Sequence, residues 1–224
     1  MTSTYDVTTG RIHYLALARE VVSDSYYHLP RVMAVSFVWS LLAATVVLAA
    51  PATAVAFAAG RSILDHEPFG VRAAVRAFQH YFWRAQVAFV PAFLLVNVAG
   101  WLWLRATATG DALPAVLAFL AVDVLVVYGF LLLYYGPLLV DDGLRRAVPV
   151  EDLPDRRPTA ADLLRASATV AVSRVGVSVA LGLFIASMGA LLAFTTVGFV
   201  VLAPVLLSAT LVQATRYLTG ESTD

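Results

Sequence analysis

The chain has 224 residues, of which 60% are hydrophobic and 13% are charged. Soluble domains carry roughly 25% charged residues, so this composition indicates an integral membrane protein. The 15 basic residues, all arginine, are balanced by 15 acids, and no basic cluster indicates nucleic-acid binding. Because the chain has no cysteine and its four histidines stand at unrelated spacings, we expect neither a metal site nor a cofactor.

Residues 1–31 predict a cytoplasmic amphipathic segment that contains the weakly amphipathic stretch IHYLALAREVV. The apolar stretch that follows, residues 32–50, is longer than the roughly 7 to 15 residues of a signal-peptide core. We therefore expect this stretch to be retained as a membrane segment.

Apolar runs follow at residues 32–60, 85–104, 112–140 and 175–215. A bilayer core of about 30 Å takes about 20 helical residues, so the last run is long enough for two crossings. The prediction is an all-α, multi-pass bundle in the cell membrane, with five to six crossings in one domain over residues 32–217 and a tail at 218–224. The crossings are expected at about residues 26–49, 51–65, 85–104, 113–135, 175–193 and 197–215.

The first run has 29 residues, too many for one upright crossing and too few for two full ones. If it crosses once, the arginines divide eleven to four between the two sides, and if it folds back at Pro51 they divide fourteen to one. Arginine in short loops favours the cytoplasm, so the hairpin explains the charges better. We predict that Pro51 and Thr53 begin the returning helix and that both termini are cytoplasmic. A single helix kinked at Pro51 is the alternative.

Residues 70–84 predict an interfacial helix on the cytoplasmic leaflet. Val71, Val75 and Phe78 share one helical face, and the basic residues Arg72, Arg76 and Arg84 lie outside that face or at its end. Such a helix buries its apolar face at the lipid boundary and offers its arginines to anionic lipid.

Three further segments carry local signals. Residues 141–158 form the largest polar connection and predict either a partner-docking surface or a plain solvated link. Thr159 followed by Asp162 predicts a capping box at the start of the next helix. A row of small residues every four positions predicts close helix packing: Ser178, Gly182, Ala186 and Ala190.

The stretch SFVWSLLAATVVLAAPATAVAFAAGRSILDHE, residues 36–67, resembles the N-terminal signature of the YesL-like membrane proteins, a family of unknown function. The resemblance rests on Trp39, the Pro-Ala-Thr step at residues 51–53, Arg61 and the acidic turn at residues 65–67. Ser36 stands where the family usually has asparagine. The resemblance implies an accessory role near carbohydrate transport, without a defined chemical activity.

Asp123 is the strongest candidate for a functional side chain, because it lies about ten residues into its crossing, near the middle of the membrane. Asn97 is expected at a similar depth in the preceding, antiparallel crossing. Together they could form a proton-linked, cation-linked or substrate-binding polar site, since ionisable groups at that depth are costly. Alternatively, they form an interhelical hydrogen bond with a structural role.

An aromatic group, Trp101, Trp103, Tyr128, Tyr134 and Tyr135, predicts an interfacial belt or, less well, a sugar-stacking cavity. The sequence contains no Walker loop, nucleophile elbow or zinc-spaced histidine pair, so an enzyme is the least favoured class. Two classes remain. One is a non-catalytic accessory subunit that contacts the bilayer and a transport system, and the other is a small transporter or channel, as a possible homo-oligomer, that uses Asp123.

Overall fold

The computed structural model describes residues 5–6, 11–12, 14–43, 45–142, 144, 158–194 and 202–219. Within these ranges all elements are helical except the two-residue strands β1 (Tyr5–Asp6) and β2 (Arg11–Ile12), which pair antiparallel. The helices are α1 (Tyr14–Tyr27), α2 (Leu29–Ala43), α3 (Val46–Leu64), α4 (Val71–Thr109), α5 (Ala112–Val140), α7 (Ala160–Ser173), α8 (Val175–Phe194) and α10 (Ala203–Thr219). The prediction of an α-helical membrane bundle is confirmed.

Helices α3 and α10 form the centre of the bundle. Of the 17 residues of α10, 12 are buried, and the helix contacts α1, α2, α3, α5 and α8. The two central helices cross at Gly60, where an added Cβ would lie 2.7 Å from the backbone nitrogen of Ala209. Glycine is therefore required at this crossing, because a side chain would push the two backbones apart.

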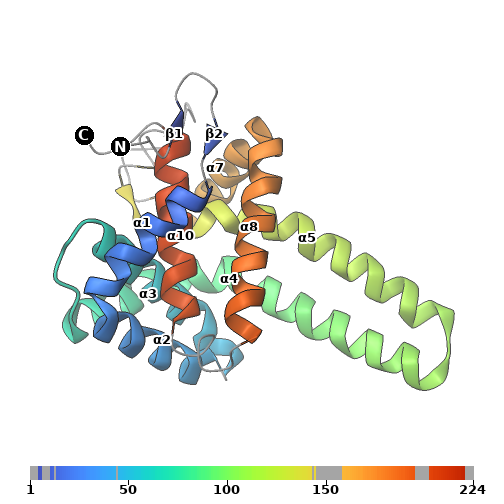
Figure 1. The fold of residues 1–224 in the computed structure, drawn as a ribbon. Helices are drawn as coiled ribbons and strands as arrows, with labels where there is room; N and C mark the ends of the chain where they lie inside the picture. The colour runs from blue at the N-terminus through green and yellow to red at the C-terminus, as the bar shows by residue number, and fades with distance from the viewer. Residues whose placement is uncertain are drawn as a thin grey trace.

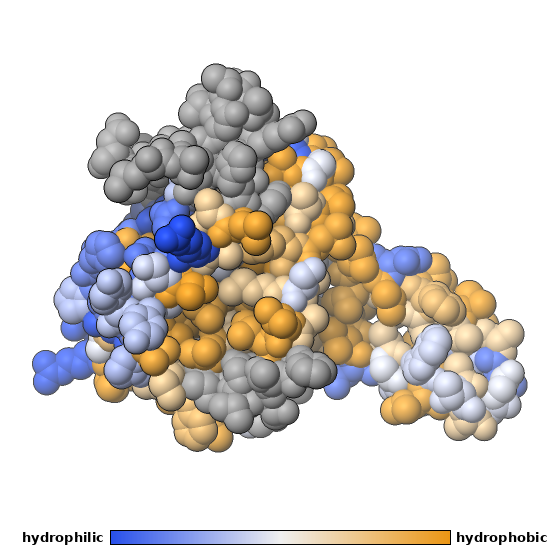
Figure 2. Space-filling model, in the orientation of Figure 1, coloured by the Kyte–Doolittle hydropathy of each residue, from blue (hydrophilic) through white to orange (hydrophobic). Residues whose placement is uncertain are grey.

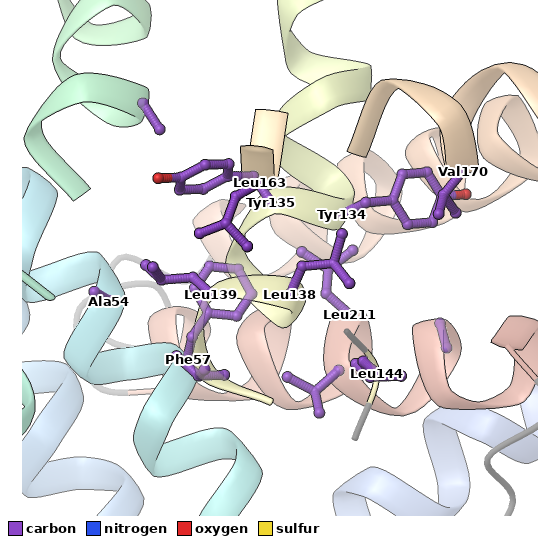
Figure 3. Close-up of a cluster of buried hydrophobic side chains, with 14 of the residues drawn as sticks. Ala54, Phe57, Tyr134, Tyr135, Leu138, Leu139, Leu144, Leu163, Val170 and Leu211 are labelled. Carbon is purple, nitrogen blue, oxygen red and sulfur yellow. The ribbon is translucent and has the colours of Figure 1, made fainter. Parts of the chain in front are cut away.

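The last turns of α5 complete the core beside α3, α7 and α10 (Figure 3). The aromatic and aliphatic side chains of this cluster include Phe57, Tyr134, Tyr135, Leu138, Leu139, Leu163 and Leu211. Tyr134 and Tyr135 are fully buried, and their hydroxyl groups bond Ser178 Oγ at 2.8 Å and the backbone oxygen of Arg84 at 2.8 Å. Burying these two tyrosines thus leaves neither hydroxyl without a partner.

Helices α2 and α3 are antiparallel neighbours and not one kinked helix. The indole nitrogen of Trp39 donates to Thr53 Oγ1 at 3.1 Å, and Arg31 Nη1 donates to the backbone oxygen of Glu67 at 3.0 Å. Residues 31 and 67 therefore lie at the same end of the bundle. The predicted fold-back of the first apolar run is present.

The predicted position of the turn, at Pro51, is wrong. Thr45 is the N-cap of α3, and Pro51 lies inside that helix. A proline at this position has no N–H to give to the carbonyl group of Val47, four residues earlier. Gln86 of α4 supplies the missing donor, because its Nε2 lies 2.5 Å from the Val47 oxygen. Helix α3 can therefore continue through Pro51.

Helix α4 is one helix of 39 residues, about 58 Å long at 1.5 Å per residue. Residues 70–84, predicted as a separate interfacial helix, instead form the N-cap and the beginning of α4, and the helix continues without a break at Arg84. Residues 80–90, on either side of Arg84, contain neither proline nor glycine, so no local signal ends the helix there. Helix α4 ends at Gly110, whose φ of 70° is the left-handed conformation typical of a helix C-terminus.

The second part of α4 and the first part of α5 leave the bundle as a helical hairpin, which projects to the right in Figure 1. We call residues 92–127 the arm. The hydroxyl of Tyr128 donates to the backbone oxygen of Ala88 at 2.7 Å and fastens the two helices where the arm begins.

Four helical segments among the described residues are long and apolar enough to cross a membrane: Val47–Leu64, Val71–Thr109, Ala112–Val140 and Val175–Leu192. Helices α2 and α10, which hold the other two predicted crossings, have 15 and 17 residues and are shorter than the usual span of about 20. Large apolar surfaces of α8 and the arm face outward (Figure 2). Exposed apolar surface of this extent is unfavourable in water but favourable in the hydrocarbon core of a bilayer.

The capping box predicted at the start of α7 is present. The backbone nitrogen of Asp162 donates to Thr159 Oγ1 at 3.3 Å, and the backbone nitrogen of Thr159 donates to Asp162 Oδ2 at 2.8 Å. Most of the predicted polar loop, residues 143 and 145–157, lies outside the described residues.

The small-residue row on α8 packs along only its first half. Ser178 is buried, and an added Cβ at Gly182 would lie 3.5 Å from Phe130. Ala186 and Ala190 are exposed among the described residues.

Candidate functional site

The predicted polar pair lies on the arm, but its two members do not meet. Asn97 and Asp123 are both exposed, and the amide of Asn97 donates to the backbone oxygen of Phe93 on its own helix at 2.6 Å. No hydrogen bond or ion pair joins Asp123 to any residue that the structure describes. The expected Asp–Asn bond between the crossings is therefore wrong, because the two side chains point away from the α4–α5 contact.

The outer face around Asp123 is apolar. Residues three and four positions away lie on the same side of a helix. At these positions the exposed fractions of Phe119, Leu120, Val126 and Val127 are 60%, 54%, 53% and 66%. Asp123 and Asn97 line none of the three large cavities found among the described residues. The arrangement thus places one carboxyl group on a lipid-facing helix surface and not in an internal path.

The aromatic group divides between two places. Trp101 and Trp103 are exposed toward the tip of the arm, where Trp103 packs edge-on against Phe119 and the Arg105 guanidinium lies 5.4 Å from the Trp101 ring centre. Tyr134 and Tyr135 are in the core, as described above. A single sugar-stacking cavity is therefore not formed by these five residues, and the two tryptophans occupy positions suited to an interfacial belt.

Pro51 and Thr53, which were predicted to begin the returning helix, instead have a packing role inside α3. Pro51 is buried inside α3. Thr53 Oγ1 donates to the backbone oxygen of Ala49 at 2.8 Å and accepts the indole hydrogen of Trp39. Thr53 thus joins α2 to α3. Because Pro51 has no N–H, the Val47 carbonyl group is free to accept a hydrogen bond from Gln86 of α4.

The three predicted basic residues lie along one helix but in different surroundings. Arg72 and Arg76 lie near the start of α4, where Arg72 is exposed and Arg76 lines a cavity of about 650 Å³ together with Arg61 and His80. Arg84 is half-buried further along the helix. The sequence assigns these arginines to one membrane boundary, and the structure distinguishes Arg76 as the one that faces a cavity.

Four charged side chains that were not predicted to meet form a cluster at the end of the bundle, where α3, α5 and α10 finish. Arg216 donates to Asp141 Oδ2 from Nε at 2.9 Å and from Nη2 at 2.7 Å, and to Asp65 Oδ1 from Nη1 at 2.7 Å. Arg61 donates to Asp65 Oδ2 at 3.1 Å and to the backbone oxygen of Val140 at 2.6 Å. The cluster thereby joins three helices.

Burial and charge pairing shift the pKa values of Asp65 and Arg216 in opposite directions. Burial by itself raises the pKa of Asp65, but hydrogen bonds and the positive charge of Arg216, followed by those of Arg61, hold that pKa below its ordinary value. Burial alone would lower the pKa of Arg216, yet its bonds to Asp65 and Asp141 raise it. Asp65 and Arg216 are therefore charged at neutral pH, and the cluster acts as a structural tie.

A second polar contact joins α1 to α10 at this same end. Glu20 accepts a hydrogen bond from Gln213 Nε2 at 3.0 Å and another from the Tyr217 hydroxyl at 2.9 Å. The sequence signal for both groups of contacts is the same: polar and charged residues stand just where apolar runs begin or end. That signal fixes their depth but does not say which residues pair.

Among the described residues, no group of three or more His, Asp or Glu side chains could hold a metal ion. Among the ion pairs of the cluster, those of Arg216 with Asp65 and Asp141 join different helices, whereas the Arg61–Asp65 pair lies at the end of α3. Comparison with models of protein families, with curated proteins and with solved structures found no match.

Proposed function

We propose that this protein is a non-catalytic accessory subunit that packs against a membrane partner through its α4–α5 arm. The observation that supports the proposal is the outer face of α5, where Asp123 lies among exposed apolar side chains and has no partner within the described chain. A carboxyl group in the hydrocarbon region is costly unless another group binds it. A neighbouring helix with a hydrogen-bond donor at the same depth would reduce that cost.

The partner class that we propose is a transport system, with carbohydrate as the cargo. Support for this class comes from the resemblance of residues 36–67 to the YesL-like proteins. The protein would lie in the cell membrane with both termini cytoplasmic, as the arginine distribution favours.

Site-directed cross-linking tests the proposal, because the natural chain has no cysteine. A single cysteine at Leu120, on the Asp123 face, should cross-link to a membrane subunit of a transporter in native membranes. Leu183→Cys on α8 is the control, since Leu183 is also apolar and 65% exposed. Asp123→Leu should reduce the cross-link from position 120, whereas Asp123→Asn, which keeps a hydrogen-bonding group, should retain it.

The outcomes separate this proposal from the transporter alternative. Equal cross-linking from positions 120 and 183, or cross-linking that is indifferent to Asp123→Leu, would contradict docking through the arm. Substrate flux in liposomes that contain this protein alone, lost in Asp123→Ala, would instead establish a transporter. Because Asp123 faces outward, such a transporter would need a second copy to enclose the path.

A further inference from the structure

An apolar groove lies between α2 and the beginning of α4. Its volume is about 610 Å³, and Ala52 and Val55 of α3 form its floor. Among the described residues that line it, Arg31 is the one with a charge. The apolar walls come from both helices, with Val35, Val38 and Leu42 on α2 and Val71, Val75 and Phe78 on α4.

The groove is about as long as one leaflet of a bilayer is thick. From Arg31 to Leu42 the helix rises about 16 Å, and half of a bilayer core is about 15 Å. Arg31 marks one end, because it bonds the backbone of Glu67 at the end of the bundle. Val38 and Val75 are 52% and 49% exposed, so the groove is open along its side to surrounding lipid.

Two arginines beside the groove, Arg31 and Arg76, have no carboxylate partner among the described residues. Arg31 Nη1 donates a hydrogen bond to the Glu67 backbone oxygen. The rest of the Arg31 guanidinium group binds no carboxylate among the described residues. The adjoining cavity of about 650 Å³, which shares Phe69 and Gln79 with the groove, is lined by Arg76. Arg76 has no hydrogen-bond or ion-pair partner among the residues that the structure describes.

We infer that this groove binds one anionic phospholipid, with an acyl chain along the α2–α4 groove and the headgroup phosphate between Arg31 and Arg76. The apolar walls exclude a free phosphate as the whole ligand, and the arginines favour an anionic lipid over a zwitterionic one. Glu67 also lines the adjoining cavity, and its negative charge would oppose binding of the phosphate.

Native mass spectrometry of the full chain, with phosphatidylglycerol or phosphatidylcholine added to detergent micelles, tests the inference. We expect phosphatidylglycerol to be retained in preference to phosphatidylcholine, and inorganic phosphate not to displace it. Arg31→Gln and Arg76→Gln should each weaken phosphatidylglycerol binding about tenfold, the effect of losing one charge-assisted hydrogen bond. Glu67→Gln should strengthen it, because it removes the opposing charge.

The control for loss of charge is Arg72→Gln, since Arg72 lies on the same helix but does not line either cavity. It should leave binding unchanged. Ala74→Phe, which fills the groove, should weaken retention of the acyl chain without removing charge. Equal binding of the two lipids, displacement by inorganic phosphate, or equal effects of Arg72→Gln and Arg76→Gln would overturn the inference. If Arg31→Gln does not fold, Arg76→Gln supplies the loss-of-charge comparison, because Arg76 makes no hydrogen bond or ion pair with the described residues. Arg31→Lys, which keeps the charge, should retain phosphatidylglycerol binding.

Discussion

At the scale of single residues, Gln86 and Pro51 form a compensating pair across two helices. Gln86→Met should destabilise the protein by about 1 to 3 kcal/mol, because the Val47 carbonyl then loses its donor. In a protein that also carries Pro51→Ala, Gln86→Met should lower the free energy of unfolding by less, since the alanine supplies the ordinary helical N–H to the Val47 carbonyl group. Thermal unfolding of the four proteins in detergent gives the coupling energy. Equal costs in the two backgrounds would show that Gln86 does not replace the missing donor.

Arg216 is the residue on which the charged cluster depends, because it binds both aspartates. Arg216→Gln should destabilise the protein by about 3 kcal/mol or more, since the Asp141 side chain is only 4% exposed and would lose the two hydrogen bonds that it accepts from Arg216. Adding Asp141→Asn should recover part of that loss. The measurement is the unfolding midpoint in detergent, with exposed Arg72→Gln as the control expected to change it little.

Residue depth could be predicted from the sequence, whereas residue pairing could not. Counting residues places Asp123 near the middle of its crossing and Asn97 at a similar level. Their failure to meet has a physical reason: depth depends on rise per residue, but direction depends on where the neighbouring helix packs. The Arg216 bonds to Asp141 and Asp65 join residues 75 and 151 positions apart, so no local pattern could indicate them.

At the scale of helices, the crossing of α3 and α10 depends on the absence of a side chain at Gly60. Gly60→Ala should destabilise the bundle by about 1 to 3 kcal/mol, because the new methyl group would overlap backbone atoms of Ala209 that cannot rotate away. Gly100→Ala in α4 is the matched control, since nothing lies within 4 Å of its added Cβ. That control should be neutral or stabilising, as alanine favours helix over glycine. Unfolding midpoints that fall equally would contradict a tight α3–α10 crossing.

Helix boundaries were predictable where a local signal was complete. Thr159 and Asp162 satisfy each other's backbone and side-chain groups, so the start of α7 needs no distant contact. Pro51 is an incomplete signal, because a proline inside a membrane helix is tolerated where neighbouring groups satisfy the carbonyl group that it leaves without a donor. Gln86, 39 positions from Val47, supplies that donor.

At the scale of the whole molecule, the polar ties gather at one end and the arm projects from the bundle. The Arg31–Glu67 and Glu20–Tyr217 bonds and the Arg216 cluster place α1 and the ends of α3, α5 and α10 on one side. Hydropathy alone indicates apolar helices but not that α3 is the central one, with 61% of its apolar window buried. Burial inside a membrane bundle and exposure to lipid both call for apolar residues, so composition does not separate them.

This arrangement predicts which single cysteines share a side of the membrane. Ser23→Cys and Glu67→Cys should react with a membrane-impermeant maleimide only in inverted vesicles, because α1 and the end of α3 lie at the end that we expect to be cytoplasmic. Thr45→Cys and Ala108→Cys, at the turns of the two helical hairpins, should react from outside intact cells. The cysteine-free parent controls for background labelling, and detergent should make all four positions reactive. Labelling of Ser23→Cys and Glu67→Cys from opposite sides would contradict the antiparallel α2–α3 hairpin, since its two outer ends would then lie across the membrane from each other.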